Sequence, residues 1–568
     1  MYPPASRTAR TALLVGLAIL CSVYGPRAEA QERPGAAPLG VNLEGIADYA
    51  RLTMFADLMK SSRRWGSARL PWVHDVSVDE DGWPLEDAGV VVRIVKRDPG
   101  ESASARRYMQ PGVYRLSFTG KARVTPVASK GVTVRGMRHD LQTHRSSAEL
   151  VVGHEVSQLM LSFTDTRGGI RDAQLLSPGA RPGQVFTDEF LRAVEPFSVL
   201  RLLGPLAPNS DPPGTWSQRP RPDAASQGGP RGMAWEYAVA LANEARKDIW
   251  INVPYKADDA YVRALAQFLK TGLAPERKVY LEFSNELWNH VFKQTRENMQ
   301  AAVAEALAGD LSLTRGQACT AQEFSRTQGR CNAFWAGQFR VGKRIARIAE
   351  IFAEVFGRDA MNAQVRPVLS TQFANRGMAE QVLKNIAVYR GKPSTILWGI
   401  ASAPYIYLDH ETAKSTSAQK EEILASLLNS LDSEVLPFFA AGTGAKAVNR
   451  GAAYTGGDWT GATQKALADF YGLRSAAYEG GVDMRQYDVN LPAKYSANLD
   501  EKMGSVVERL LTRWYGCGND LFVYLSLSSA YNRWGYWGLT HDPRNLDTPK
   551  LAAARRAAAS AAAGQSCS

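Results

Sequence analysis

From about residue 184 to the C-terminus, short apolar runs alternate with segments whose apolar residues recur at helical spacing. Asp248 to Val253 predicts a buried strand, and the helical pattern from Tyr261 to Leu269 follows it. Such alternation is typical of a parallel sheet covered by helices. The expected strands lie at 198–203, 248–253, 279–283, 365–370, 395–401, 474–478 and 521–527. The expected helices lie at 233–246, 261–269, 334–356, 371–389, 420–439, 499–515 and 550–563.

An eighth strand is expected near the N-terminus, where the apolar run Leu39 to Leu43 precedes a helical pattern from Arg51 to Arg64. Eight βα units predict an α/β fold, a closed (β/α)8 TIM barrel. The chain has 568 residues, which is too long for one ordinary core and suits a barrel with insertions.

The sequence pattern changes between the first βα unit and the second strand. Residues 67–180 alternate apolar and polar side chains between turns, which predicts an inserted antiparallel β-sandwich-like domain. Its expected strands lie at 90–95, 112–119, 131–134, 148–152 and 158–163. It either binds carbohydrate or caps the barrel. We therefore expect a first βα unit at 31–66, the insertion at 67–180 and the remaining barrel at 181–568.

The first 30 residues have the features of a secretory signal peptide. Arg7 and Arg10 precede the apolar stretch Thr11 to Val23, and Ala28-Glu29-Ala30 is a small-x-small cleavage site. The apolar stretch is short for a membrane anchor, and Leu20 before Cys21 argues against a lipoprotein signal. The prediction is a secreted or periplasmic protein with no integral membrane segment after cleavage.

Four cysteines remain after cleavage: Cys319, Cys331, Cys517 and Cys567. An even number in an exported chain predicts disulfides. Three pairings are possible, and local spacing favours Cys319–Cys331 and Cys517–Cys567. No pair has CxxC spacing and no histidine lies near, so no metal site is expected.

The formal net charge is +11, and it falls to about +9 without the first 30 residues, which contain three arginines and one glutamate. The positive charge is spread along the chain without a dense run, so a nucleic-acid partner is not expected. Attraction to an acidic polysaccharide or envelope surface is one interpretation, and an ordinary solvated surface is the other.

The strongest chemical signal is Leu281-Glu282-Phe283-Ser284-Asn285-Glu286-Leu287-Trp288-Asn289, where an apolar strand ends in Asn-Glu. The second is Tyr478-Glu479-Gly480-Gly481, where the seventh strand ends in a carboxylate and glycines allow a tight turn. The carboxyl ends of barrel strands form the catalytic face. Taken singly, Glu286 is equally a helix-start carboxylate and Glu479 a turn residue. Together, they favour catalysis.

A barrel with Asn-Glu after strand 4 and Glu after strand 7 resembles glycoside hydrolase clan A, the 4/7 superfamily of cellulase-, xylanase- and mannanase-like TIM-barrel hydrolases. The resemblance covers nearly all of the chain except the signal and the insertion. It implies Glu286 as acid/base and Glu479 as nucleophile of a retaining hydrolase without a cofactor. Clan members often carry a histidine near strand 3 or strand 6, and this chain departs from that pattern.

The resemblance also implies substrate-binding residues. These are Asn285 for the sugar 2-hydroxyl, Arg201 to orient the nucleophile, Tyr405 (with Tyr407 second) to hydrogen-bond it, and Trp534 and Trp537 as a sugar floor. Trp288, which follows Glu286 in the same loop, is a further candidate for substrate binding. For Tyr405, core packing is the alternative. Loop aromatics, namely Trp216, Tyr255, Trp288 and Trp459, either stack on sugars or pack locally.

The resemblance implies that the two carboxyls lie roughly 5–5.5 Å apart, a spacing that predicts a double displacement with retained configuration. The expected function is therefore a secreted glycosidase that cleaves β-linked polysaccharide or oligosaccharide. The alternatives are a non-catalytic carbohydrate-binding or envelope protein on a barrel scaffold, and a transglycosylase. No GxSxG, HExxH or Walker A motif is present in the sequence.

Overall fold

The structure is a computed structural model that describes residues 37–102, 107–324, 329, 331–439, 463–560 and 567. The expected signal peptide, Cys21 and Trp459 lie outside the described residues. No described helix combines the length and the apolarity that a bilayer crossing requires.

Eight parallel strands close into a barrel in the order β1-β10-β11-β12-β13-β14-β16-β18. The barrel closes because β1 pairs with both β10 and β18. The α/β barrel expected from the sequence is thus confirmed. The strands are β1 Leu39–Asn42, β10 Val199–Arg201, β11 Asp248–Val253, β12 Val279–Phe283, β13 Val365–Ser370, β14 Gly399–Ser402, β16 Arg474–Ala477 and β18 Phe522–Tyr524.

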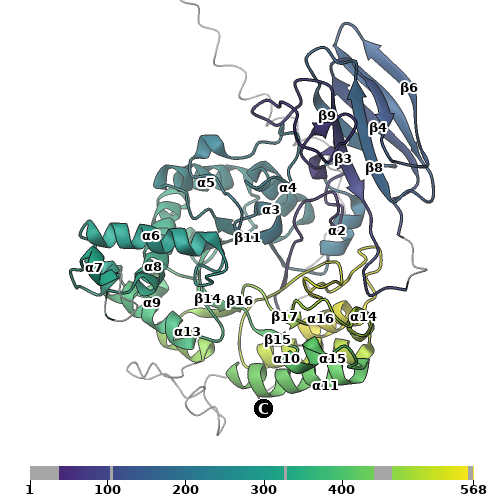
Figure 1. Cartoon of the computed structure of the whole chain (residues 1–568). Coiled ribbons are helices and arrows are strands. Elements are labelled where there is room, and N and C mark those ends of the chain that lie inside the picture. The colour runs from purple at the N-terminus through teal and green to yellow at the C-terminus, as the bar shows by residue number, and fades with distance from the viewer. Residues whose placement is uncertain are drawn as a thin grey trace, which may run out of the picture.

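Helices surround this barrel (Figure 1). The longer ones are α4 Trp235–Ala245, α5 Asp259–Gly272, α6 Lys293–Leu307, α8 Ala333–Phe356, α9 Arg376–Tyr389, α11 Lys420–Ser430, α15 Glu501–Gly516 and α16 Pro549–Ser560. Shorter ones are α2 Asp188–Val194, α3 Leu203–Leu206, α7 Ala321–Phe324, α10 His410–Lys414, α13 Gln464–Tyr471 and α14 Leu491–Asn498. Helix α6 was not expected from the sequence.

The alternation along each barrel strand decides which side chains reach the site. On β11, Ile249, Ile251 and Val253 belong to the large core shared with the helices, whereas Trp250 belongs to a second core inside the barrel. Asn252 is on the same side as Trp250, because successive strand side chains point to opposite faces. Polar residues at inward positions near the strand ends therefore face the carboxyl end of the barrel, where TIM-barrel enzymes have their active sites.

The insertion consists of two antiparallel sheets, ordered β2-β3-β8-β5 and β6-β7-β4-β9. It has its own apolar core, which includes Trp65, Trp83 and Phe163. In Figure 1 it projects from one side of the barrel, beyond α2. The strands are β2 Gly66–Ser67, β3 Ala88–Ile94, β4 Gly112–Thr119, β5 Arg123–Pro126, β6 Val132–Asp140, β7 Arg145–Val152, β8 Gln158–Thr164 and β9 Arg171–Leu176.

The helix predicted from Arg51 to Arg64 does not form, so this prediction is wrong. Only one short 3-10 turn, η1 Leu58–Ser61, forms there. The neighbouring chain is extended, because Phe55 bridges to Phe186 and Asp57 to Leu176 where the insertion begins and ends. These tertiary pairings override the helical pattern, and α2, after the insertion, supplies the first barrel helix.

Two smaller boundaries also differ from expectation. The strand expected at 395–401 begins only at Gly399, after the 3-10 turn η5 Pro393–Thr395. The helix expected at 420–439 ends as α-helix at Ser430 and continues as the π-helical turn η6 Leu431–Val435. In both segments the apolar pattern is longer than the regular element, because residues before the strand and after the helix are also buried.

Candidate active site

The two glutamates singled out by the sequence follow β12 and β16, the fourth and seventh strands of the barrel. After β12 the chain turns through Ser284 and Glu286, whose φ angles are 60° and 45°. Non-glycine residues rarely adopt this left-handed conformation, which costs of order 1–3 kcal/mol and persists where the surroundings hold it. The turn directs Glu286 back over the barrel end, and it is 8% exposed.

The structure brings Glu286 and Glu479 together. Their carboxyl groups are close enough to share a hydrogen bond. Burial raises the pKa of Glu286 to about 8, and the charge of Glu479 adds to the increase. Asn289 Nδ2 and Tyr478 Oη donate to the two oxygens of Glu286, at 2.9 and 3.1 Å. These hydrogen bonds lower the pKa and partly offset the increase. No cation pairs with Glu286 among the described ion pairs.

Glu479 has a different environment. Its Oε2 accepts from Arg201 Nη1 at 3.1 Å, and its Oε1 accepts from Tyr405 Oη at 2.9 Å. Burial raises the pKa of Glu479, while the Arg201 guanidinium and the Tyr405 hydroxyl lower it. Because the cation lies against Glu479, we assign the shared proton to Glu286. Tyr407, the second choice from the sequence, has no bond to Glu479 among the described contacts.

Arg201 is fully buried at the end of β10 and holds several groups at once. Besides Glu479, it donates to Asn42 Oδ1 at 2.9 Å and to Asn285 Oδ1 at 2.7 Å. It also gives two bonds to Glu282 Oε2, at 3.1 and 2.8 Å. One guanidinium on β10 therefore contacts residues in or just after three other barrel strands, β1, β12 and β16.

Glu282 is the main site residue that the sequence reasoning did not identify. It is on β12 and is 1% exposed, and its Oε2 also accepts from Trp250 Nε1 and Asn252 Nδ2 at 2.8 and 3.0 Å. Its Oε1 is buried without a partner among the described residues. A charged residue within the apolar run VYLEF was the available signal, because its alternation places Tyr280 and Glu282 on the inward face.

Asn285 is buried beside Glu286, and Asn209 Oδ1 accepts from its Nδ2 at 3.2 Å. Gln294, at the start of α6, donates to the same Asn209 oxygen at 2.6 Å and to the Asn285 carbonyl at 3.2 Å. Asn209 belongs to the loop after β10, which this bridge ties to the chain after β12.

The three tryptophans expected at the site lie in different surroundings. Trp288 is half-buried and lines a small hollow with Glu282, Glu286, Gln338 and Ser370. Trp537 is half-buried and lies beside Asp483, whereas Trp534 is 57% exposed and is covered on one face by Arg533 at 4.6 Å.

Two other loop aromatics pack locally. Trp216 packs edge-on against Tyr261 with ring centroids 5.3 Å apart, and Tyr255 donates to Glu297 at 2.7 Å.

Among the described residues, one group has a spacing compatible with a metal ion, Asp98, Glu101 and His541. Its two carboxylates already pair with Arg51 and Arg107. Arg107 also pairs with Asp542 at 3.0 Å, so this cluster ties the insertion to the loop before α16.

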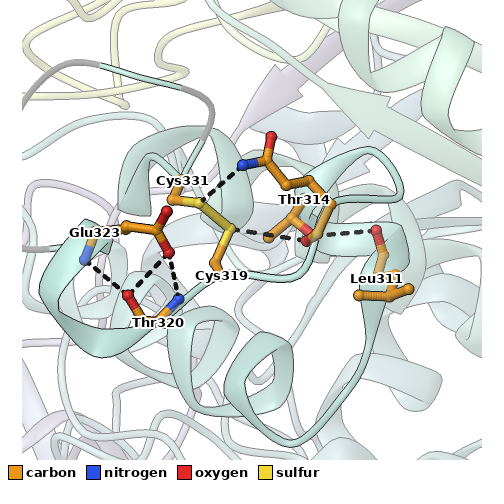
Figure 2. Close-up of a disulfide and its surroundings, with 7 residues drawn as sticks. Leu311, Thr314, Cys319, Thr320, Glu323 and Cys331 are labelled. Carbon is orange, nitrogen blue, oxygen red and sulfur yellow. Dashed lines mark hydrogen bonds between the residues drawn. A yellow bond between two sulfur atoms is a disulfide. The ribbon is translucent and has the colours of Figure 1, made fainter.

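Both expected disulfides are present, Cys319–Cys331 and Cys517–Cys567. Figure 2 shows the first, which closes the segment between the 3-10 turn η3 Leu311–Thr314 and α8. Cys319 Sγ lies 3.7 Å from the Gln317 carbonyl oxygen, and Gln317 Nε2 lies 3.8 Å from Cys331 Sγ. The second fastens the C-terminal Cys567 to the end of α15.

No family model matches the chain, and no curated protein matches it. Solved structures that resemble it include an endo-1,4-β-D-xylanase 10B of Clostridium thermocellum with CBM22-1 and GH10 modules, at 10% identity and TM-score 0.33, covering 90% of this chain and 96% of that one. A GH10 endoxylanase from a sugarcane soil metagenome is 11% identical with TM-score 0.33, covering 65% and 93%. An arabinose-bound GH51 α-L-arabinofuranosidase is 10% identical with TM-score 0.32, covering 92% and 80%. The barrel assignment itself comes from the strand pairings of this chain.

Proposed function

We propose that this chain is an exported retaining glycosidase that cleaves β-linked polysaccharide or oligosaccharide. The observation that carries the proposal is the pair Glu286 and Glu479, which lie in hydrogen-bond contact at the ends of barrel strands four and seven. Glycoside hydrolysis needs one protonated and one ionised carboxyl at the scissile bond. The different surroundings of the two glutamates support that division.

The spacing favours retention over inversion. Inverting enzymes keep their carboxyls roughly 6.5–9.5 Å apart to admit a water molecule, whereas retaining enzymes keep them at about 5–5.5 Å. Two carboxyls that share a hydrogen bond belong to the close regime. Glu479 would then attack the anomeric carbon while Glu286 protonates the departing oxygen.

The surrounding groups support a proton cycle. Arg201 and Tyr405 hold Glu479 ionised and fix its two oxygens, which aims the nucleophile. When Glu479 becomes glycosylated, its charge disappears and the pKa of Glu286 falls. Glu286 can then accept a proton from the water that releases the sugar. Asn285 keeps one amide hydrogen beyond its bond to Asn209, which suits a sugar 2-hydroxyl.

Export is part of the proposal. The two disulfides support an oxidising compartment. If the signal peptide is cleaved as expected, N-terminal sequencing of protein from the periplasm or medium should begin at Gln31. A start at Met1 in exported material would contradict it.

The test is hydrolysis of aryl β-glycosides and β-linked polysaccharides by wild type, Glu286→Ala and Glu479→Ala, with Glu276→Ala as control. Glu276 is 63% exposed, so this variant should keep full activity. Adding azide distinguishes the roles, because a small anion can replace the missing carboxylate. Glu479→Ala with azide should give the α-glycosyl azide, and Glu286→Ala should give the β-glycosyl azide.

Three outcomes would contradict the proposal. A wild type that binds a glycan without cleaving it would favour the non-catalytic carbohydrate-binding alternative. Full activity in either alanine variant would remove that residue from the mechanism. Products consisting only of longer glycans would indicate a transglycosylase.

A further inference from the structure

A two-stranded ribbon extends the barrel wall above Glu479. Strands β15 Tyr405–Tyr407 and β17 Gly481–Asp483 follow β14 and β16, and they pair in parallel outside the barrel sheet (Figure 1). Ile406 and Val482 are fully buried against the helices. Since side chains alternate along a strand, Tyr405, Tyr407 and Asp483 share the opposite face.

That face lies next to Glu286 and Glu479. Tyr405 Oη donates to Glu479, and the ring of Tyr407 follows with its centroid 5.8 Å from that of Tyr405. The Tyr407 ring is 39% exposed. Tyr407 pairs in register with Asp483, so the half-buried carboxylate lies next to the phenol. The charges of Glu286 and Glu479 both act on the Tyr407 hydroxyl, which places this position near the reacting atoms.

Trp537 adds a second aromatic surface. Its indole lies beside the Asp483 carboxylate. The ring packs on the backbone of Gly535, where a Cβ would come within 2.3 Å of a ring atom. Gly535 has φ 147°, and its missing side chain lets the loop after β18 hold the indole against the ribbon. Two aromatic rings and a carboxylate are the groups that bind sugars, through stacking and hydroxyl hydrogen bonds.

The charges nearby decide which sugars fit. The described carboxyls here are Glu282, Glu286, Glu479 and Asp483, against the guanidiniums of Arg201 and Arg485. Arg485 covers the Tyr407 ring at 5.1 Å and donates from Nε to the Leu408 carbonyl at 2.6 Å, so part of its binding capacity is already used. With the proton on Glu286, the site keeps an excess of negative charge.

We propose that Tyr407, Asp483 and Trp537 form a sugar subsite that binds a neutral glycosyl unit and disfavours a uronate. Asp483 accepts hydrogen bonds from sugar hydroxyls, and the rings contact the sugar faces. The inference rests on the proposed function for its role in catalysis. The chain's positive net charge alone would suggest an acidic polysaccharide, whereas the charges around this subsite favour a neutral one.

The test is calorimetric binding of β-linked gluco-, xylo- and manno-oligosaccharides of one to six units to Glu286→Gln, which prevents turnover. The same titrations use Glu286→Gln combined with Asp483→Asn, and glucuronate-containing oligosaccharides of equal length. We expect Asp483→Asn to weaken neutral ligands that reach the subsite by about 10- to 100-fold, the range for hydrogen bonds to a charged group. Asp469→Asn, on α13 and 48% exposed, is the matched control.

Unchanged affinity in the Asp483→Asn protein, with unchanged melting temperature, would overturn the inference. So would tighter binding of the uronates than of the neutral series, which would assign the site to Arg485. Absence of binding to every ligand would overturn it too. Asp483-dependent binding without hydrolysis by wild type would defeat the proposed function alone, whereas hydrolysis with Asp483-independent binding would defeat this inference alone.

Discussion

Replacing Glu286, the proposed acid/base residue, should stabilise the fold, and the gain should grow with pH. Glu286 has an ordinary pKa of 4.5 and is raised to about 8 in the folded protein. Between these values the folded chain keeps a proton that the unfolded chain releases, so stability falls as pH rises. At pH 7 this effect costs roughly 3 kcal/mol, taking about 1.4 kcal/mol for each pH unit between the two pKa values.

Glu286→Gln cannot ionise, so it escapes this cost. Its amide offers one oxygen, whereas both oxygens of the Glu286 carboxyl accept a bond, from Tyr478 and Asn289, and the mismatch costs about 1 kcal/mol. The expected net gain is about 2 kcal/mol at pH 7, with little difference near pH 4.5.

Thermal melts of wild type and Glu286→Gln at pH 4.5, 6, 7 and 8 measure the effect without a substrate. The variant should melt a few degrees higher at pH 8 than wild type. Glu276→Gln, at an exposed position, should follow wild type at every pH. A variant that melts lower throughout, or a gap that shrinks as pH rises, would refute the assignment of the proton to Glu286.

Three further outcomes are expected. Arg201→Met should lower stability by about 3–5 kcal/mol, because it leaves buried carboxylates unpaired, and a small loss in urea melts would contradict the network. Tyr405→Phe should keep the fold but lower kcat/KM by about 10- to 100-fold, since it removes a hydrogen bond to the nucleophile; unchanged kinetics would exclude that role. Selective removal of Cys517–Cys567 should cost about 4 kcal/mol, against about 3 kcal/mol for the shorter disulfide loop, and the reverse order in denaturant melts would argue against loop entropy.

The glutamate pair could be predicted from the sequence because each residue terminates an apolar strand. Parallel strands all end at one rim of a barrel, so strand order alone brings Glu286 and Glu479 to the same place. Arg201 and Tyr405 followed from the resemblance, and their contacts with Glu479 agree with the roles it implies. The catalytic roles themselves stay predictions until the variants are assayed.

Glu282 and Asn42 escaped that reasoning for a physical reason. Glu282 lies within the strand expected at 279–283, and Asn42 lies within the apolar run expected at 39–43, so an apolar pattern describes their neighbours correctly and hides them. Only the pairing register shows which residues lie beside them. Asn42 is opposite Arg201, and Glu282 is opposite Asn252. Register depends on contacts between strands far apart in sequence, which a single strand's pattern does not contain.

The failed helix at Arg51 to Arg64 has a related cause. Apolar residues at helical spacing also suit a segment that packs on two sides, and here one side meets the barrel while the other meets the insertion. Phe55 packs against Phe186 with ring centroids 5.8 Å apart, and Met59 belongs to the insertion's core. In this segment, backbone bridges to residues at the end of the insertion therefore take the place of helical hydrogen bonds.

The sharing of Arg201 explains why a third glutamate benefits the site. One guanidinium serves both Glu282 and Glu479, so its charge does not fully offset either carboxylate. The charge of Glu282 raises the pKa of Glu479, and the pair as a whole keeps a negative excess that a proton on Glu286 relieves. In the proposed mechanism, glycosylation would remove the charge of Glu479, Arg201 and Glu282 would then balance each other, and Glu286 would have less reason to keep its proton. Under the proposed double displacement, Glu282 would let a single buried cation support both steps.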